Sequence, residues 1–261
     1  MTTETKDTIT NTQFLDRGDG VSIAYNYTPG RAPCVVFLSG FKSDMTGSKA
    51  TALEHHCQTM GQAFLRLDYQ GHGVSSGTFE GGSIGEWAED AVSVLDHMTS
   101  TQGVEKFLLV GSSMGGWIML LCALQLKKRV CALIGIAAAP DFTENLIDAT
   151  LNQEQRTELD RTGQIEFACD YEDGPLIITE KLLEDGRHQM LLKTEIDLEM
   201  PVRLIHGMED EEVPWATALD LARQLRSTDV ELQLVKSGGH RLSEPQDMER
   251  LFKTLDGLLK N

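Results

Sequence analysis

Short apolar runs alternate with helical segments along most of this chain, and that alternation limits the possible fold more than any other feature. Runs typical of buried strands occupy residues 34–40, 63–68, 107–111, 130–138, 202–207 and 231–235. Helical patterns occupy residues 47–60, 83–100, 114–126, 215–226 and 245–259. Such strands, separated by helices, form a mostly parallel sheet that helices cover on both faces.

The N-terminal part of the chain departs from this alternation. A short strand near Phe14, a Gly-Asp-Gly turn and a strand over 21–27 predict an antiparallel hairpin at one edge of the sheet. The hairpin brings the expected number of strands to eight. Farther along, Ser83 followed by Glu86 predicts a capping box at the start of the helix over 83–100.

The alternation stops at Pro140 and resumes near residue 202. Residues 141–199 are helix-biased and hold 16 acidic against 5 basic residues, a net charge of −11. We therefore expect residues 1–140 and 200–261 to form one core, and residues 141–199 to form an acidic, helical cap inserted into it.

Charge and hydropathy exclude several classes of partner. The chain carries 23 basic and 40 acidic residues, a formal net charge of −17, which would repel nucleic acid and anionic lipid. No apolar run approaches the roughly 18 residues of a membrane helix, so we expect no integral membrane association. The polar N-terminal tail, with Glu4 and Asp7, does not look like a signal or transit peptide. These features predict a cytoplasmic protein that is a monomer or a homodimer.

The motif Gly111-Ser112-Ser113-Met114-Gly115 lies between an expected strand and an expected helix. In a sharp strand-to-helix turn, bulky side chains two residues before and after a serine would collide, so glycine is required at both places. Ser113 is then exposed as a nucleophile, and the backbone N–H of Met114 lies at a helix N-terminus, where it can stabilise an oxyanion. Ser112 is out of register with the glycines. The alternative is a glycine-rich packing turn without catalytic function.

A nucleophilic serine needs a base, and His240 is the best candidate among seven histidines. His240 lies in a glycine-rich loop after the last expected strand, where it is free to reach Ser113. His72 and His206 also follow strands, but each precedes a glycine in a tight turn, so we expect them to make structural hydrogen bonds. The other histidines lie in expected helices or in the cap: His55, His56, His97 and His188.

The imidazole in turn needs a carboxylate that fixes its tautomer. The segment HGMEDEEVP, residues 206–214, follows the penultimate expected strand and offers four acidic side chains: Glu209, Asp210, Glu211 and Glu212. Spacing alone does not choose among them. The chain order of serine, acid and histidine is the one found in hydrolases with a serine at such a turn.

The segments GSSMGG, DYQGHGVSSG, HGMEDEEVP and SGGH together resemble the α/β-hydrolase superfamily. In the family pattern H-G-x-x-D-x-x-V-P the acid is the fifth residue, which implies Asp210. The family's second oxyanion donor is a backbone N–H after the third strand, which implies Phe41. The chain has Ser39-Gly40 where the family commonly has His-Gly, a change that leaves this main-chain donor in place.

More narrowly, SGFKSDMTGSKA, DYQGHGVSSG, GSSMGGW and HGMEDEEVPW resemble the branch of mitochondrial palmitoyl-protein thioesterases that also cleave acyl glucuronides, and its bacterial esterase relatives. The mitochondrial location is not carried over, because no transit peptide is visible. Ser113, His240 and Asp210 are then expected to hydrolyse a small-molecule carboxylic ester or thioester through an acyl-enzyme.

No metal or organic cofactor is expected, because the chemistry needs none and no metal-site spacing occurs. We expect the cap to wall an acyl pocket with Phe142, Leu146 and Phe167. Two alternatives stay open: a peptidase or another C–X hydrolase on the same fold, and a ligand receptor that keeps the triad but turns over poorly. Ser113 argues against dehalogenases and epoxide hydrolases, which normally use Asp at this position.

Overall fold

A computed structural model describes residues 12–167 and 176–260. The N-terminal tail with Glu4 and Asp7, and residues 168–175 of the expected cap, lie outside the described residues. No helix in the described part of the chain is both long enough and apolar enough to cross a membrane.

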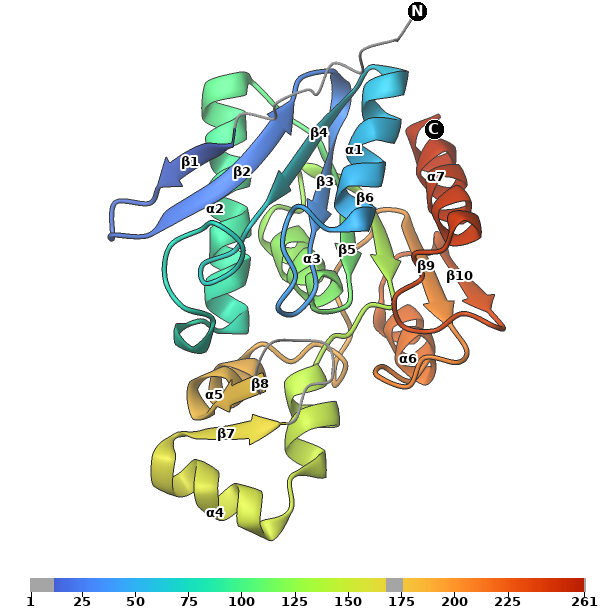
Figure 1. The fold of residues 1–261 in the computed structure, drawn as a ribbon. Coiled ribbons are helices and arrows are strands. Elements are labelled where there is room, and N and C mark those ends of the chain that lie inside the picture. The colour runs from blue at the N-terminus through green and yellow to red at the C-terminus, as the bar shows by residue number, and fades with distance from the viewer. Residues whose placement is uncertain (1–11, 168–175, 261) are drawn as a thin grey trace, which may run out of the picture.

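The centre of the molecule is an eight-stranded sheet with the order β1-β2-β4-β3-β5-β6-β9-β10 (Figure 1). β2 pairs antiparallel with β1 and β4, and all other neighbours are parallel, so the predicted mixed sheet is confirmed. The strands are β1 (Gln13–Asp16), β2 (Ser22–Thr28), β3 (Arg31–Leu38), β4 (Gln62–Leu67), β5 (Phe107–Ser112), β6 (Val130–Ile136), β9 (Val202–Gly207) and β10 (Val230–Val235).

Helices cover both faces of the sheet because successive strand residues point to opposite sides. Along β3, Val35 and Phe37 belong to one buried cluster, whereas Val36 and Leu38 belong to the other. The first cluster includes residues of α1 (Ser48–Met60) and α7 (Pro245–Leu259). The second includes residues of three further helices: α2 (Ile84–Gln102), α3 (Met114–Gln125) and α6 (Ala216–Gln224).

The described part of the chain between β6 and β9 adds no strand to the large sheet, and it lies beyond the carboxyl ends of the parallel strands (Figure 1). It contains a π-helical turn at η2 (Thr143–Ile147), a 3₁₀ turn at η3 (Asp148–Thr150), α4 (Gln153–Thr162) and α5 (Glu180–His188). It also contains an antiparallel pair, β7 (Gln164–Phe167) with β8 (Leu176–Thr179), which the expectation of a helical cap missed. The isoleucines of these two short strands favour extended structure. The exact cap boundaries stay a prediction.

The start of α2 also differs from expectation. Ser83 is the N-cap residue, but its side chain makes no capping hydrogen bond, so the predicted capping box is wrong. Glu86 forms an ion pair with Lys181 of α5 at 2.7 Å instead.

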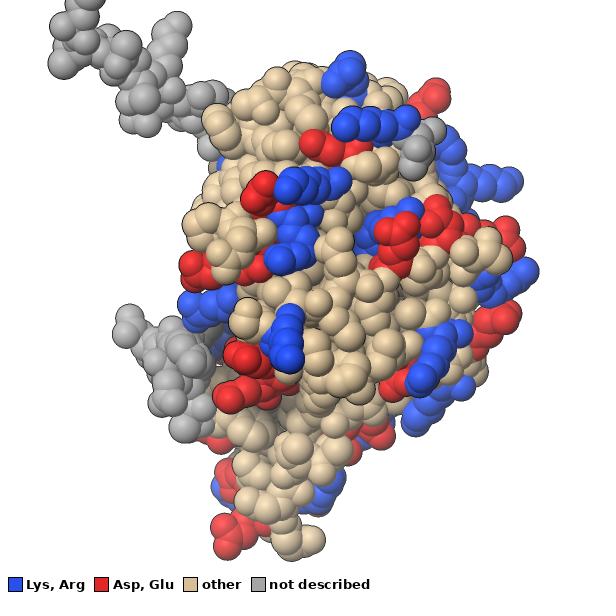
Figure 2. Space-filling view, turned by 90° about the vertical axis from the view of Figure 1, so that its right-hand side faces the viewer, with Lys and Arg blue, Asp and Glu red and all other residues tan. Residues whose placement is uncertain are grey.

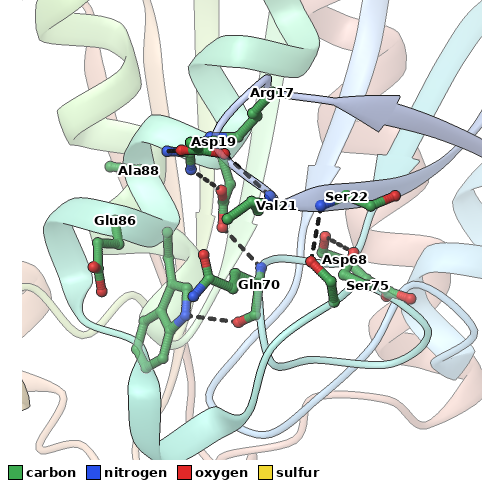
Figure 3. A network of polar contacts seen from close by, with 12 residues as sticks. Arg17, Asp19, Val21, Ser22, Asp68, Gln70, Ser75, Glu86 and Ala88 are labelled. Atoms are coloured by element: carbon green, nitrogen blue, oxygen red, sulfur yellow. Dashed lines mark hydrogen bonds and ion pairs between the residues drawn. The ribbon is translucent and has the colours of Figure 1, made fainter.

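A polar network ties the N-terminal hairpin to α2 (Figure 3). Arg17 forms an ion pair with Asp90, whose carboxylate also accepts the backbone N–H of Gln70 at 2.8 Å. Trp87 donates its indole N–H to the carbonyl of Gln70 at 3.0 Å. Asp90 is completely buried, and burial raises its pKa despite these hydrogen bonds. The network fixes the loop that follows β4.

Charged side chains lie along the opposite edge of the sheet, which is formed by β10. Arg203 of β9 pairs with Asp229 at 2.7 Å and with Glu231 of edge strand β10 at 3.4 Å. Figure 2 shows basic and acidic side chains interspersed over this side of the molecule. Charged side chains along an edge strand disfavour pairing with the strand of another chain.

Candidate active site

Ser113 lies on a strained turn between β5 and α3. Its backbone has φ 54° and ψ −122°, a conformation that residues other than glycine rarely adopt. A Cβ on Gly111 would lie 2.3 Å from the carbonyl oxygen of Gly115, and a Cβ on Gly115 would lie 2.1 Å from that of Leu38. The turn therefore requires both glycines, for the steric reason inferred from the sequence.

The loop after β10 brings His240 to this serine. The Nε2 atom of His240 is 3.1 Å from the hydroxyl oxygen of Ser113, and its Nδ1 atom is 2.8 Å from Oδ2 of Asp210. With the proton on Nδ1, the imidazole donates to the carboxylate and accepts from the serine hydroxyl. Three residues that follow three different strands thus form one hydrogen-bonded chain.

Asp210 is the one carboxylate of the segment HGMEDEEVP that is buried. Its Oδ1 accepts the backbone N–H groups of Glu212 at 3.0 Å and Val213 at 2.8 Å. Burial alone would raise the pKa of Asp210, but hydrogen bonds from His206, His240 and Val213 outweigh it and hold that pKa well below its usual range. Asp210 is therefore charged at neutral pH.

The three neighbouring glutamates are exposed. Glu209 and Glu211 make no described contact with His240, and the carboxylate of Glu212 lies 3.6 Å from its Nε2. Of the four acids that spacing left open, the structure brings Asp210 to His240 Nδ1.

The two candidate oxyanion donors, Phe41 and Met114, belong to segments next to Ser113. Met114 is the first residue of α3, and the first N–H groups of a helix have no partner within it. Phe41 follows β3 and lines the same cavity as Ser113 and His240. Gly40 brings the two segments together, because a Cβ there would lie 3.3 Å from that of Ser113.

A cavity of about 480 Å³ opens beside Ser113 and His240. Its described lining is largely polar and includes Lys42, Lys49 and Arg241. The ammonium group of Lys49 donates to the carbonyl of Arg241, which connects α1 to the loop that holds His240. The sequence interpretation did not single out these basic residues, although Arg241 directly follows the candidate base.

The three cap residues expected to line an acyl pocket were placed by the structure as follows, and their role in binding stays a prediction. Phe142, Leu146 and Phe167 are not among the described residues of this cavity, to which the segment between β6 and β9 contributes Leu176. Phe142 is buried, with its ring edge-on to Phe41 at 5.3 Å and to Trp117 at 5.7 Å between centroids. Leu146 and Phe167 pack against the apolar core. Phe142 is thus buried, whereas Leu146 and Phe167 are half-buried.

His206 and His72 are both buried, as structural histidines would be. His72 accepts no hydrogen bond at Nε2 from the described residues and is surrounded by Tyr69, Phe79 and Trp87. Burial lowers the pKa of His72 to about 4. His206 lies 3.1 Å from Asp210, a contact that the sequence interpretation did not anticipate.

Known proteins share this architecture. Residues 31–162, about half of the chain, match the family described as serine aminopeptidase, S33. The mitochondrial palmitoyl-protein thioesterase ABHD10 of Mus musculus is 38% identical over 247 residues, which span 94% of this chain and 82% of that protein. The chain therefore belongs to the hydrolase family that is described as serine aminopeptidase, S33, and the thioesterase of mouse is one of its relatives.

Solved structures also match this hydrolase over nearly its whole length. A protein from Agrobacterium vitis S4 matches with a TM-score of 0.89 and 40% identity, covering 95% of this chain and 97% of the other. The α/β-hydrolase domain-containing protein 10 from mouse matches with a TM-score of 0.86 and 36% identity, covering 95% and 98%. The predicted α/β-hydrolase fold and the resemblance to the thioesterase branch are confirmed.

The predicted cytoplasmic location of the hydrolase is contradicted. The ABHD10 relatives from five mammals, 36–38% identical to it, are all named as mitochondrial. The prediction rested on an N-terminal tail that does not look like a signal or transit peptide and on the lack of a long apolar run, and neither feature decides the compartment.

Among the described residues, no group of three or more His, Cys, Asp or Glu side chains is arranged to hold a metal ion.

Proposed function

We propose that this hydrolase cleaves carboxylic esters or thioesters through an acyl-enzyme on Ser113. The single observation that carries the proposal is the hydrogen-bonded chain from Ser113 through His240 to Asp210, with contacts of 3.1 and 2.8 Å. In this geometry the serine proton can pass to His240 as the oxygen attacks a carbonyl carbon.

In the first half of the reaction, a bond forms between Ser113 Oγ and the acyl carbon. The resulting oxyanion accepts hydrogen bonds from the backbone N–H groups of Phe41 and Met114. The tetrahedral intermediate then collapses: the bond between the acyl carbon and the leaving oxygen or sulfur breaks, and His240 gives its proton to that leaving atom. In the second half, His240 takes a proton from water as the water oxygen attacks the acyl carbon; the bond from that carbon to Ser113 Oγ then breaks, the acid is released, and His240 returns the proton to Oγ. Asp210 stabilises the imidazolium in both halves.

Two observations support an acyl ester or thioester as substrate. The relatives of this chain include proteins named as palmitoyl-protein thioesterases. Ser113 and His240 also line the same cavity, whose largely polar lining suits a polar leaving group. We further propose that residues 141–199 act as a cap over this site, inserted into a core of residues 1–140 and 200–261.

The proposal is tested with p-nitrophenyl butyrate and S-phenyl thiobutyrate, which carry the same acyl group on oxygen and on sulfur. The native enzyme is expected to hydrolyse at least one of them, and Ser113→Ala to lose on the order of 10⁴- to 10⁶-fold in kcat while keeping its circular dichroism spectrum. Comparable turnover by a folded Ser113→Ala variant would refute the proposal.

A peptidase is the second candidate, favoured by the description of the matching family as a serine aminopeptidase. Alanine p-nitroanilide separates the two activities. Hydrolysis of this amide at a kcat/KM similar to that of the butyrate ester would favour the peptidase.

A further inference from the structure

A second histidine contacts the candidate catalytic acid. His206 is the penultimate residue of β9, and its side chain is completely buried. Its Nε2 atom lies 3.1 Å from Oδ2 of Asp210 and 2.9 Å from the carbonyl oxygen of Val213. The Oδ2 atom it contacts is the one that accepts from His240 at 2.8 Å.

The surroundings of His206 decide which nitrogen carries the proton. Its Nδ1 atom is buried and has no hydrogen-bond partner among the described residues. A proton on Nδ1 would leave a buried donor unpaired, which is unfavourable, whereas a proton on Nε2 has two acceptors. His206 is therefore an Nε2–H donor, shared between the carbonyl of Val213 and the carboxylate of Asp210.

Val213 closes a ring of hydrogen bonds around Asp210. Its backbone N–H donates to Oδ1 of Asp210 at 2.8 Å, and its carbonyl accepts from His206. Backbone N–H groups thus hold one carboxylate oxygen, and two histidines hold the other. Without His206, the backbone bonds would still anchor Oδ1, but Oδ2 would keep a single partner.

We infer that His206 is a positioning residue for the acid: its Nε2–H fixes the plane of the Asp210 carboxylate so that Oδ2 faces Nδ1 of His240. This inference rests on the proposed triad. It differs from a purely structural role, in which His206 would only hold the turn after β9 through the carbonyl of Val213.

Three replacements of His206 separate the two roles. In His206→Gln, the amide nitrogen lies about as far along the side chain as imidazole Nε2 and keeps a donor. His206→Leu fills a similar volume without a donor. The amide of His206→Asn stops short of the position of Nε2, which gives a second variant without the donor if the leucine variant fails to fold.

The variants are compared by kcat and KM for p-nitrophenyl butyrate, and by their rate of inactivation with a fluorophosphonate. His206→Leu and His206→Asn are expected to lose about 10- to 100-fold in kcat and in inactivation rate, since misplaced catalytic groups cost rate, with KM changed less than about twofold. His206→Gln is expected to recover most of kcat.

A double-mutant cycle makes the test specific to the acid. If His206 acts through Asp210, His206→Leu should lower kcat by less than about threefold in an Asp210→Asn background. An equal loss in both backgrounds, or a native kcat in folded His206→Leu or His206→Asn, would overturn the inference. The proposed triad would fail separately, through an active Ser113→Ala variant.

Discussion

Replacing Gly115 by alanine tests whether the packing of the turn sets the catalytic geometry. A Cβ at this position would lie 2.1 Å from the carbonyl oxygen of Leu38 and 2.5 Å from that of Ser39, whereas ordinary contacts begin at 3.4 Å. Both neighbours are backbone atoms, so no side chain can rotate away. The start of α3 and the end of β3 must therefore separate by about 1 Å.

That separation acts directly on the site, because these two segments carry Met114 and Phe41. A misplacement of about 1 Å can cost on the order of 100-fold in rate, or about 2.7 kcal/mol of transition-state stabilisation. Gly115→Ala is expected to lose about this much in kcat for p-nitrophenyl butyrate. Gly111→Ala should behave similarly, because its Cβ would lie 2.3 Å from a backbone oxygen.

Gly257→Ala is the matched control. A Cβ on Gly257, within α7, meets nothing within 4 Å. This variant is expected to keep native kcat and to gain about 0.5–1 kcal/mol in free energy of unfolding, because alanine is the better helix former. Circular dichroism and urea unfolding check that each variant is folded. A folded Gly115→Ala enzyme with native kcat would refute the steric argument.

Two further predictions concern the acid and the buried histidine. Asp210→Asn should lower kcat on the order of 10⁴-fold, while Glu211→Gln should change it less than about threefold; the reverse order would show that another residue is the acid. The pKa of His72 is about 4 when folded, below its ordinary value of 6.5, so the unfolded chain binds the proton first as the pH falls. Stability should therefore drop by up to about 3 kcal/mol between about pH 6.5 and pH 4, and urea unfolding at several pH values should show a smaller drop in His72→Gln.

Local sequence patterns predicted the sheet well because most of the parallel strands carry their own apolar run, as β4 and β5 do. The same patterns were less informative where tertiary contacts decide the outcome. Ser83 and Glu86 have the sequence of a capping box, yet Glu86 pairs with Lys181 of α5, a helix that is far away in the sequence. The strands of the β7–β8 pair have four residues each, too few for a clear alternation.

The site shows the same division. The spacing of Gly111, Ser113 and Gly115 predicts the turn because its steric reason is local. The pairing of Asp210 with His240 depends on where two loops meet, so the family pattern, and not spacing, selected Asp210. The contact of His206 with Asp210 and the packing of Phe142 against Phe41 arise from three-dimensional proximity, which one sequence does not encode in a readable pattern.

The central claim, an acyl-enzyme on Ser113, is tested most directly by stopping the reaction with p-nitrophenyl butyrate in acid within milliseconds and measuring intact and peptide masses. The account predicts one butyryl group per chain, located on Ser113 and absent from Ser112, which disappears as the substrate is exhausted. In Asp210→Asn the adduct should form more slowly, and in Ser113→Ala it should not form. A butyryl group on Ser112 or on another residue of the native enzyme, formed at the rate of turnover, would contradict the account.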